Sequence, residues 1–308
     1  MGISRILAVD GGGVRGVVPA IVLQRLCAEP SLEGWLDRVD FLAGTSTGGL
    51  IALSLAAGID VGELRALYEE RAAQVFADSL FDDLKDLGKL LGADYRVTNL
   101  EREIHRVLGD RTLAQLGKRV LVPAFDLDSE AVTERSWKPK LFHNFPGEDS
   151  DGDTLAYHVG TATAAAPTYF ATFDGYVDGG VFATNPSMCA LAQTQDVRIP
   201  ADERANLAEL RLLSLGTGRS LRYIEGKTHD WGYVQWVRPL LDVMLDGVNG
   251  VAHYQCSQLL STRYHRLAPT FPPGRHIGMD AVTDIPYLVD FASRLDLSTT
   301  REWLHANW

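Results

Sequence analysis

Two glycine-rich turns within the first fifty residues constrain how this chain can fold. Each turn follows a short apolar run, at residues 6–9 or 41–43, and each precedes a segment whose apolar residues recur at helical spacing. A strand, a tight turn and a helix in succession form a βα unit, and two such units predict a parallel sheet. Strand-like runs follow at residues 120–125, 141–144, 176–178, 210–215 and 264–267. The expected fold class is therefore α/β with a mainly parallel central sheet.

Helical spacing dominates most of the remaining sequence. Helices are expected within residues 61–116 and at residues 156–166, 231–245, 251–260 and 285–304, and residues 149–153 have the composition of a solvated loop. The chain has 308 residues, of which 46% are hydrophobic, so it can bury a large core. We expect one domain over residues 1–308, with the motifs in a core at 5–218 and a mainly helical part at 219–308.

The second glycine turn, Gly44-Thr45-Ser46-Thr47-Gly48, matches the nucleophile-elbow pattern Gly-X-Ser-X-Gly. It lies between a predicted strand and a predicted helix, which is the context that the pattern requires. The elbow crowds the positions two before and two after the serine, so glycine fits at both. The pentapeptide alone is equally consistent with a glycine-rich turn, but its placement favours Ser46 as a nucleophile at a helix N-terminus, where the dipole stabilises negative charge.

The first glycine turn spans residues 10–16 and has backbone amides that are free to bind an anion. It is a candidate oxyanion hole. Gly11, Gly13 and Gly16 also satisfy the dinucleotide pattern Gly-X-Gly-X-X-Gly, which makes a nucleotide-binding regulatory or redox protein the alternative. A dinucleotide site needs an acidic residue at the end of the second strand, whereas Asp37 and Asp40 precede that strand. This position disfavours the nucleotide hypothesis.

A candidate general base is Asp178, which ends a predicted strand and precedes Gly179 and Gly180. The glycines allow close backbone approach, although Asp-Gly steps are also common in turns. A Ser-Asp-His triad would follow the chain order of α/β-hydrolases, but in that fold the elbow comes after several strands and here it comes after two. The histidines that such a triad could use are His229, His253, His265 and His276.

Together these motifs resemble the patatin-like phospholipase family. That family combines a Gly-Gly-Gly-X-Arg/Lys-Gly loop, a Gly-X-Ser-X-Gly elbow about thirty residues later and a distal Asp-Gly-Gly or Asp-Gly-Ala. Here the three motifs occur in that order at residues 11–16, 44–48 and 178–180, and residues 165–170 and 213–218 are also similar to family segments. Three motifs in register are more specific than any one of them.

The resemblance implies a three-layer α/β/α fold and a Ser-Asp dyad that needs no histidine, metal or cofactor. By this similarity Ser46 is the nucleophile, Asp178 is the base, and the elbow is flanked by Gly44 and Gly48. The oxyanion hole would be formed by the amides of Gly12 and Gly13, and Gly11 and Arg15 lie in the same loop. Arg15 would have one of three roles: it would shape the loop, bind a lipid phosphate or form a structural salt bridge. The implied activity is hydrolysis of an acyl lipid through an acyl-enzyme, with glycerophospholipid as the expected substrate class. Acyl transfer to another alcohol would follow the same path.

Charge and cysteine content limit the partners and the compartment. The net charge is −11 and no dense block of Lys or Arg occurs, so a nucleic-acid partner is not expected. An anionic membrane would be repelled, so peripheral membrane contact would depend on local apolar surface. The strand-like residues 5–9 are too short for a signal segment, so we expect a cytoplasmic protein. Cys27, Cys189 and Cys256 lack the spacing of metal or redox motifs, so we expect reduced thiols. Oligomeric state and head-group preference are not specified.

A leucine-rich stretch at residues 80–91 suggests how an acidic protein could reach a lipid. Most of its apolar side chains share one helical face, and Lys85 and Lys89 lie on another. This face would either rest on a membrane or pack in the core, and core packing is the more common fate of an apolar stripe. The apolar residues are Leu80, Phe81, Leu84, Leu87, Leu90 and Leu91.

Overall fold

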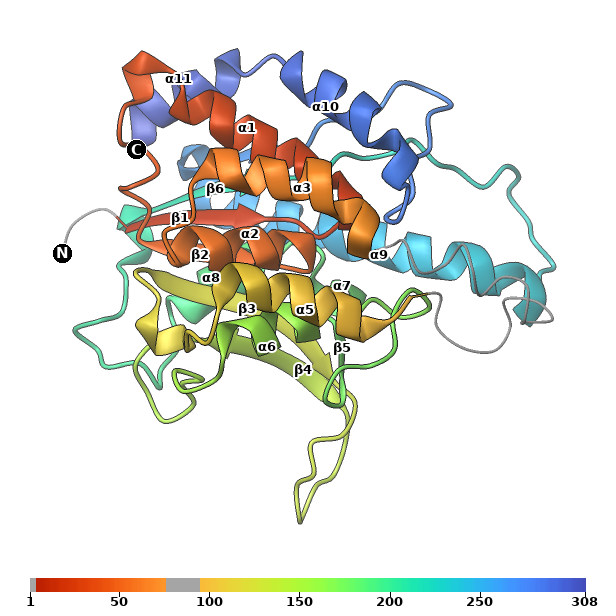
Figure 1. Ribbon diagram of the computed structural model, residues 1–308, viewed down its shortest axis with the longest axis horizontal. Helices are drawn as coiled ribbons and strands as arrows, with labels where there is room; N and C mark the ends of the chain where they lie inside the picture. Colours follow the sequence, from red (N-terminus) through yellow and green to blue (C-terminus); the bar gives the residue numbers. More distant parts are fainter. Residues whose placement is uncertain (1–3, 76–94) are drawn as a thin grey trace.

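The computed structural model describes residues 4–75 and 95–308 of the chain (Figure 1). Within these residues seven strands form one mixed sheet in the order β4-β3-β2-β1-β6-β7, and β5 pairs with β3. The strands are β1 (Ser4–Val9), β2 (Phe41–Gly44), β3 (Arg119–Asp126), β4 (Lys138–His143), β5 (Tyr176–Asp178), β6 (Leu210–Leu215) and β7 (Tyr264–Leu267). The pairs among β3, β2, β1, β6 and β7 are parallel, whereas β4 and β5 run antiparallel to β3. The predicted parallel core of the sheet is confirmed.

Helices cover both faces of the sheet, so the three-layer α/β/α fold is confirmed (Figure 1). Alternate residues of β1 point to opposite faces, as the pleat of a strand requires. Leu7 and Val9 join a core with α1, α2, α5 and α6, whereas Ile6 and Ala8 join a core with α8 and α9. The helices are α1 (Val17–Cys27), α2 (Thr47–Ala56), α3 (Val61–Val75), α5 (Val97–Leu108), α6 (Ala156–Ala164), α7 (Gly180–Ala183), α8 (Ser187–Gln193), α9 (Tyr233–Leu260), α10 (Ile285–Ser293) and α11 (Ser298–Asn307).

The order of the strands determines where a ligand can bind. The chain moves from β1 to β2 and β3 on one side, and later returns to place β6 and β7 on the other side of β1. The carboxyl end of β1 is therefore a topological switch point, where connections diverge and leave a crevice. The first glycine turn begins at this point, because Asp10 directly follows β1 and a 3-10 turn at Gly13–Gly16 leads into α1.

Two predictions for the C-terminal third were wrong in detail. Residues 231–245 and 251–260 are parts of one helix, α9, because Asn249 in the intervening segment is held by Asp10 and Arg266 and this tertiary contact overrides the glycines beside it. Residues 285–304 instead form two helices, α10 and α11, which are separated at residues 294–297. The leucine-rich stretch at residues 80–91, with its membrane and core alternatives, lies outside the described residues.

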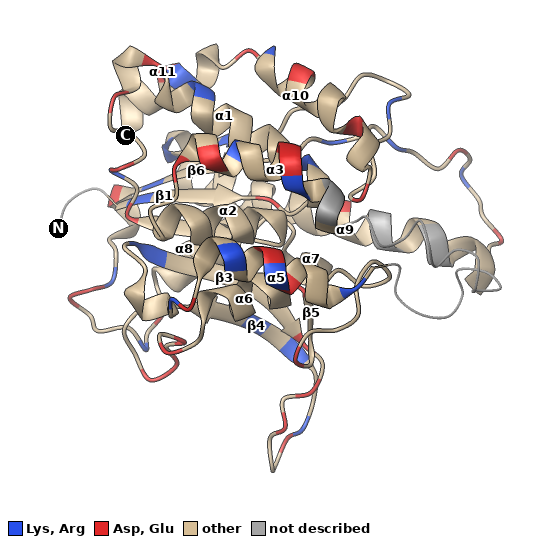
Figure 2. Ribbon diagram, in the orientation of Figure 1, with Lys and Arg blue, Asp and Glu red and all other residues tan. Residues whose placement is uncertain are grey.

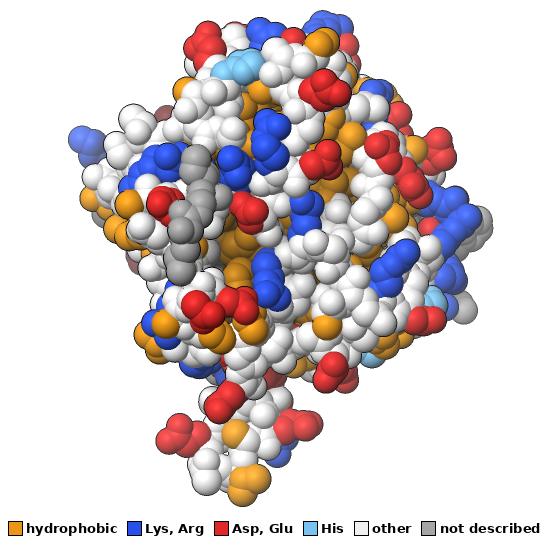
Figure 3. All heavy atoms as spheres, turned by 90° about the vertical axis from the view of Figure 1, so that its left-hand side faces the viewer, with side chains coloured by type: hydrophobic (Ala, Val, Ile, Leu, Met, Phe, Trp, Pro, Cys, Tyr) orange, Lys and Arg blue, Asp and Glu red, His pale blue; other side chains and the backbone are white. Residues whose placement is uncertain are grey.

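Surface charge is mixed. Figure 2 shows Lys and Arg interspersed with Asp and Glu over the described ribbon, and Figure 3 shows the same mixture on the face at the amino ends of the strands. In the parts of the chain that the structure describes, no helix has the length and apolarity to cross a bilayer.

A buried ion pair fastens the carboxyl end of β1 to the C-terminal part of the chain. Arg266 in β7 bonds both carboxylate oxygens of Asp10 at 3.1 and 2.5 Å, and only 7% and 3% of the two side chains are exposed. Arg266 also donates to the Ser214 hydroxyl at 2.6 Å and to the Asn249 side-chain oxygen at 2.7 Å. Because the guanidinium and the carboxylate satisfy one another, the pair tolerates burial that would be costly for either charge alone.

Replacing Arg266 by Met should lower the free energy of unfolding by about 3–5 kcal/mol, since it leaves the Asp10 carboxylate buried without its partner. Urea titration followed by circular dichroism measures the change. The matched control is Arg135→Met, which breaks the exposed pair between Arg135 and Asp128 and should leave the midpoint near that of the wild type. Equal midpoints for the two variants would show that the buried pair has no special role.

Candidate active site

Ser46 occupies a strained turn between β2 and α2. Its φ is 54° and its ψ is −126°, a conformation that non-glycine residues rarely adopt. Its amide donates to the Thr163 hydroxyl at 2.9 Å, and Thr163 donates in turn to the carbonyl of Pro123, so α6 and β3 hold the turn. The side chain lies at the N-terminus of α2, where the helix dipole favours negative charge.

The two elbow glycines are required by close backbone packing. A Cβ at position 44 would lie 2.0 Å from the carbonyl oxygen of Gly48, and a Cβ at position 48 would lie 2.2 Å from the carbonyl oxygen of Val9. Any side chain at either position would push α2 away from the end of β1. The predicted elbow at residues 44–48 is thus present as a strand, turn and helix.

Strand pairing brings Asp178 to the elbow although 132 positions separate it from Ser46. Along β3, residues Arg119–Leu121 pair with β2, whereas Ala124–Asp126 pair with β5, and β4 occupies the other edge. Strand β5 therefore continues the sheet where β2 ends. Because β5 runs antiparallel to β3, its last residue, Asp178, is the one nearest to the end of β2 and hence to Ser46.

Burial controls the charge of Asp178, whose side chain lies within the protein at 6% residue exposure. Loss of solvation raises the pKa of this carboxyl to about 6, and hydrogen bonding with the Ser46 hydroxyl and from the Gly180 amide opposes the rise. The Gly180 amide donates at 2.6 Å, and the Asp178 amide donates to the carbonyl of Ala165 at 2.9 Å. The carboxyl therefore titrates near neutral pH while its position is restrained on both sides.

The glycine loop presents two amides beside Ser46. A Cβ on Gly11 would lie 3.3 Å from the Ser46 Cβ, so the loop passes directly over the serine. Gly11 donates to the carbonyl of Thr184 and Val14 donates to that of Met279. Among the described residues, in contrast, the amides of Gly12 and Gly13 have no hydrogen-bond acceptor. Two adjacent amides without an acceptor can receive an anion.

Two side chains set the direction of these amides. The hydroxyl of Thr217 donates to the carbonyl of Gly11 at 2.8 Å, and the Nε of Arg15 donates to the carbonyl of Gly12 at 3.2 Å. In a trans peptide the carbonyl and the next amide point in opposite directions, so each contact orients the amide of the following glycine. Arg15 thus contacts the backbone of the glycine loop, and its role there stays a prediction. Thr217 was singled out by no motif, although it lies in the Gly-Thr-Gly that ends β6.

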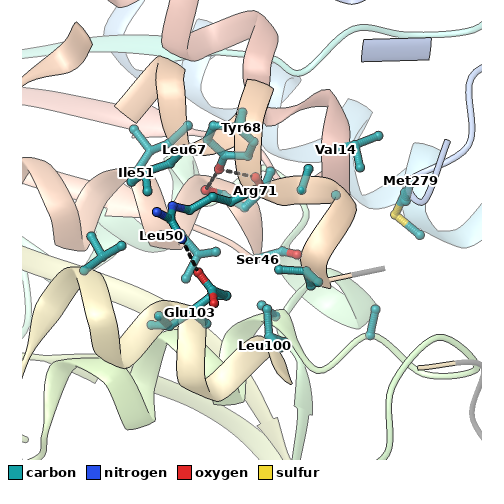
Figure 4. Close-up of a pocket in the computed structure, with 18 of the residues that line it drawn as sticks. Val14, Ser46, Leu50, Ile51, Leu67, Tyr68, Arg71, Leu100, Glu103 and Met279 are labelled. Atoms are coloured by element: carbon teal, nitrogen blue, oxygen red, sulfur yellow. Dashed lines mark hydrogen bonds and ion pairs between the residues drawn. The ribbon is translucent and has the colours of Figure 1, made fainter. Parts of the chain in front are cut away.

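An apolar cavity of about 150 Å³ opens beside Ser46 and Asp178 (Figure 4). It runs along α2 from Ser46 past Leu50 to Ser54, which at 1.5 Å per residue is about 12 Å. Helices α3 and α5 form its other walls, chiefly through Leu64, Leu67, Ala72, Val75, Leu100, Ile104, Val107 and Leu108.

Two polar contacts interrupt the apolar lining. The hydroxyl of Tyr68 bonds the Thr47 side chain and donates to the Thr47 carbonyl at 3.1 Å, which joins α3 to the first turn of α2. Arg71 on α3 and Glu103 on α5 form an ion pair at 3.3 Å that bridges the two walls, as Figure 4 shows. No sequence pattern points to these residues, because only tertiary packing brings α3 beside α5.

Two of the four histidines considered for a triad bond other residues. None of the cavity-lining residues among the described parts of the chain is a histidine. His253 bonds the Tyr264 hydroxyl at 3.2 Å, and His265 bonds the Thr300 hydroxyl at 2.9 Å and stacks on Trp303. Within residues 4–75 and 95–308, no group of three or more His, Cys, Asp or Glu side chains is arranged to hold a metal ion.

Comparison with protein families agrees with the motifs. The family model described as patatin-like phospholipase matches residues 7–191. The chain is 28% identical to the putative sporulation hydrolase CotR of Bacillus subtilis (strain 168), with 99% of this chain and 98% of the relative covered. It is 31% identical to a cGAMP-activated phospholipase of Pseudomonas aeruginosa, covering 85% and 77%, and 29% identical to patatin-like protein 1 of Oryza sativa subsp. indica, covering 78% and 66%.

Two solved structures align with most of this chain at low sequence identity. The crystal structure of the type III effector protein ExoU aligns with 99% of this chain at 12% sequence identity and a TM-score of 0.43, and this chain spans 53% of it. VipD from Legionella pneumophila aligns with 95% of this chain at 12% identity and a TM-score of 0.40, with 67% of VipD covered.

The raised pKa of Asp178 predicts a pH dependence of stability. Because the folded state favours the protonated carboxyl, its contribution is present below the ordinary value of 3.8 and is lost as the pH rises through about 6. Asp178→Asn is neutral throughout, so its free energy of unfolding relative to wild type should increase by about 2 kcal/mol between about pH 4.5 and about pH 8. Urea titrations at the two pH values measure this difference. Asp128→Asn is the control, since Asp128 is ionised over the whole range with a pKa of about 2.

Proposed function

The chain belongs to the patatin-like phospholipase family, and we propose that it hydrolyses the acyl ester of a glycerophospholipid with Ser46 as nucleophile and Asp178 as base. The observation that carries this proposal is the convergence of four groups, of which Ser46, Asp178 and Gly13 line an apolar cavity and Gly12 directly precedes Gly13. These groups are the Ser46 hydroxyl, the Asp178 carboxyl and the amides of Gly12 and Gly13. The cavity is suited to an acyl chain, since its lining is largely aliphatic and aromatic.

The proposed reaction has two steps. In the first, the Ser46 oxygen attacks the ester carbonyl, Asp178 takes the serine proton, and the amides of Gly12 and Gly13 stabilise the oxyanion. Asp178 then gives the proton to the leaving alcohol as the carbon–oxygen bond breaks. In the second step Asp178 takes a proton from water as the water oxygen attacks the acyl-enzyme carbonyl. The bond between the acyl carbon and Ser46 Oγ then breaks, Asp178 returns the proton to Oγ, and the fatty acid leaves. An alcohol in place of water would give acyl transfer by the same path.

Several features support the dyad over the alternatives. An isolated carboxylate with a pKa near its ordinary value of 3.8 is a weak base, whereas burial raises that of Asp178 to about 6, close to the optimum for proton transfer at neutral pH. The His residues considered for a triad do not line the cavity in the described chain. The nucleotide hypothesis would need an acidic residue where β2 ends, and the elbow with Ser46 lies there instead.

The dyad predicts that Ser46→Ala and Asp178→Asn each lower kcat on a short p-nitrophenyl ester by at least about 10³-fold, because the two groups act as one unit. A fluorophosphonate probe should label the wild type and leave Ser46→Ala unlabelled. The wild-type rate should increase as the pH rises through about 6, where Asp178 becomes ionised and able to accept the proton. Ser293→Ala, on the exposed side of α10, is the control and should keep full activity. Substantial turnover by either dyad variant would exclude this mechanism.

The oxyanion hole is tested through Thr217 rather than through the glycines. A Cβ on Gly12 would lie 2.3 Å from the Thr217 hydroxyl, and Gly13 has a φ of +58°, so replacing either glycine would displace the loop. Thr217→Val removes only the donor to the Gly11 carbonyl and should lower kcat about tenfold or more with little change in KM. Thr217→Ser keeps the hydroxyl and should restore kcat. If both variants lose the same activity together with thermal stability, the contact only supports the fold.

A further inference from the structure

Helix α9 exposes large apolar side chains along much of its length. The exposed fractions are 84% for Tyr233, 44% for Leu240, 52% for Met244, 55% for Val251 and 64% for Tyr254. Tyr233, Leu240, Met244, Val251 and Tyr254 recur every three to seven residues, and Val243, exposed at 51%, precedes Met244 on the same side of the helix. We name this side the outward stripe of α9. Contiguous apolar surface of this kind indicates an interaction site.

The opposite side of α9 anchors the helix to the domain. Ala252, Cys256 and Leu260 are buried against the sheet in the core that contains Ile6 and Ala8. Since the anchoring side already faces the sheet, the outward stripe has no role in the core of the described chain. Within residues 4–75 and 95–308, packing of the core therefore does not account for its apolar composition.

Helix α9 passes beside the candidate active site. Asn249 bonds Asp10 at the carboxyl end of β1, and Leu245 approaches Gly180, two residues after Asp178. The sixteen residues from Asn249 back to Tyr233 extend about 24 Å beyond this point. Figure 1 shows this half of α9 projecting past the carboxyl ends of the strands, the same end of the sheet at which Ser46 lies.

The members of the outward stripe are uncharged, and aromatic rings lie at the start of α9. The charged residues of this half, Arg238, Asp242 and Asp246, are not members of the stripe. Trp231 and Trp236 lie 5.2 Å apart between ring centroids at its start, next to the exposed Tyr233. Rings with a polar edge are suited to the boundary between lipid head groups and acyl chains.

We propose that the outward stripe of α9 docks the protein on the surface of a zwitterionic lipid bilayer. The proposal rests on the proposed function, in which the substrate is a membrane lipid. An uncharged stripe binds through apolar area and does not need an anionic surface, which a protein with a net charge of −11 would avoid. Docking there places the bilayer at the end of the domain where Ser46 and the apolar cavity lie.

Binding is measured directly, so that the outcome is independent of catalysis. Ser46→Ala protein is sedimented with phosphatidylcholine vesicles, and the partition coefficient is compared with that of a triple variant carrying Leu240→Gln, Val243→Gln and Met244→Gln. Glutamine is compatible with a helix and removes apolar surface without adding charge. The triple variant should partition at least about tenfold more weakly. The matched control carries Val132→Gln, Val197→Gln and Leu207→Gln, which are exposed at 102%, 78% and 37% away from α9, and should bind like the parent.

Each outcome has a defined meaning. Equal binding by the two triple variants, or no binding by the parent, overturns the proposal. The alternative occupant of the outward stripe is a second copy of the chain, and gel filtration tests it. A change from dimer to monomer in the α9 triple variant, with vesicle binding retained, would overturn the proposal in favour of this dimer. Melting temperature and activity on a soluble ester, measured with Ser46 present, should match the wild type in both variants. If the triple exchange lowers the melting temperature, the vesicle partition coefficient of the single variant Met244→Gln is compared with that of Val197→Gln instead. Vesicle binding without esterase activity would retain the docking surface and reject the proposed function.

Discussion

The close contact between the first turn of α2 and the end of β1 is the constraint on which the site depends. The carbonyl of Val9 lies where a Cβ of residue 48 would be, and the carbonyl of Gly48 lies where a Cβ of residue 44 would be. This contact brings the N-terminus of α2 and the glycine loop together at the switch point of the sheet, and forces Ser46 into a conformation with positive φ. The surrounding structure must therefore maintain this strain, which it does through Thr163 from α6 and the backbone of β3.

Burial has two opposite effects at this end of the sheet. Asp10 is kept buried and charged because Arg266 lies against it, and the pair ties β1 to β7. No cationic side chain among the described residues pairs with the buried Asp178, so loss of solvation raises its pKa to about 6 and leaves it less stable as a carboxylate. The Asp10 carboxylate joins β1 to β7 through its ion pair, whereas the raised pKa of the Asp178 carboxyl favours proton uptake. The ion pair of Asp10 with Arg266 thus stabilises a fold in which Asp178 is kept buried at a cost in solvation free energy.

Residues 219–308 carry none of the family motifs, but they contact Asp10 and the glycine loop. Arg266 and Asn249 surround Asp10, and the carbonyl of Met279 accepts from Val14 and lies against Gly13. The glycine loop is consequently enclosed by residues on both sides of its strand. The same part of the chain supplies α9, whose anchored side faces the sheet and whose outward stripe remains exposed.

The sequence by itself determined the α/β class, the parallel core of the sheet and the family, because glycine turns at strand ends and helical periodicity are local signals. It also predicted the elbow at residues 44–48, since only glycine fits backbone contacts of this kind. Tertiary structure alone decided which side chains surround these motifs. Arg266, Tyr68 and the pair of Arg71 with Glu103 come from segments outside the motifs, and Thr217 lies in a family-like segment that gives it no role. The contacts of all these residues arise from strand order and helix packing. The continuity of α9 through Asn249 was likewise decided by its bonds to Asp10 and Arg266, because a buried charge network outweighs the weak local preference of nearby glycines to end a helix.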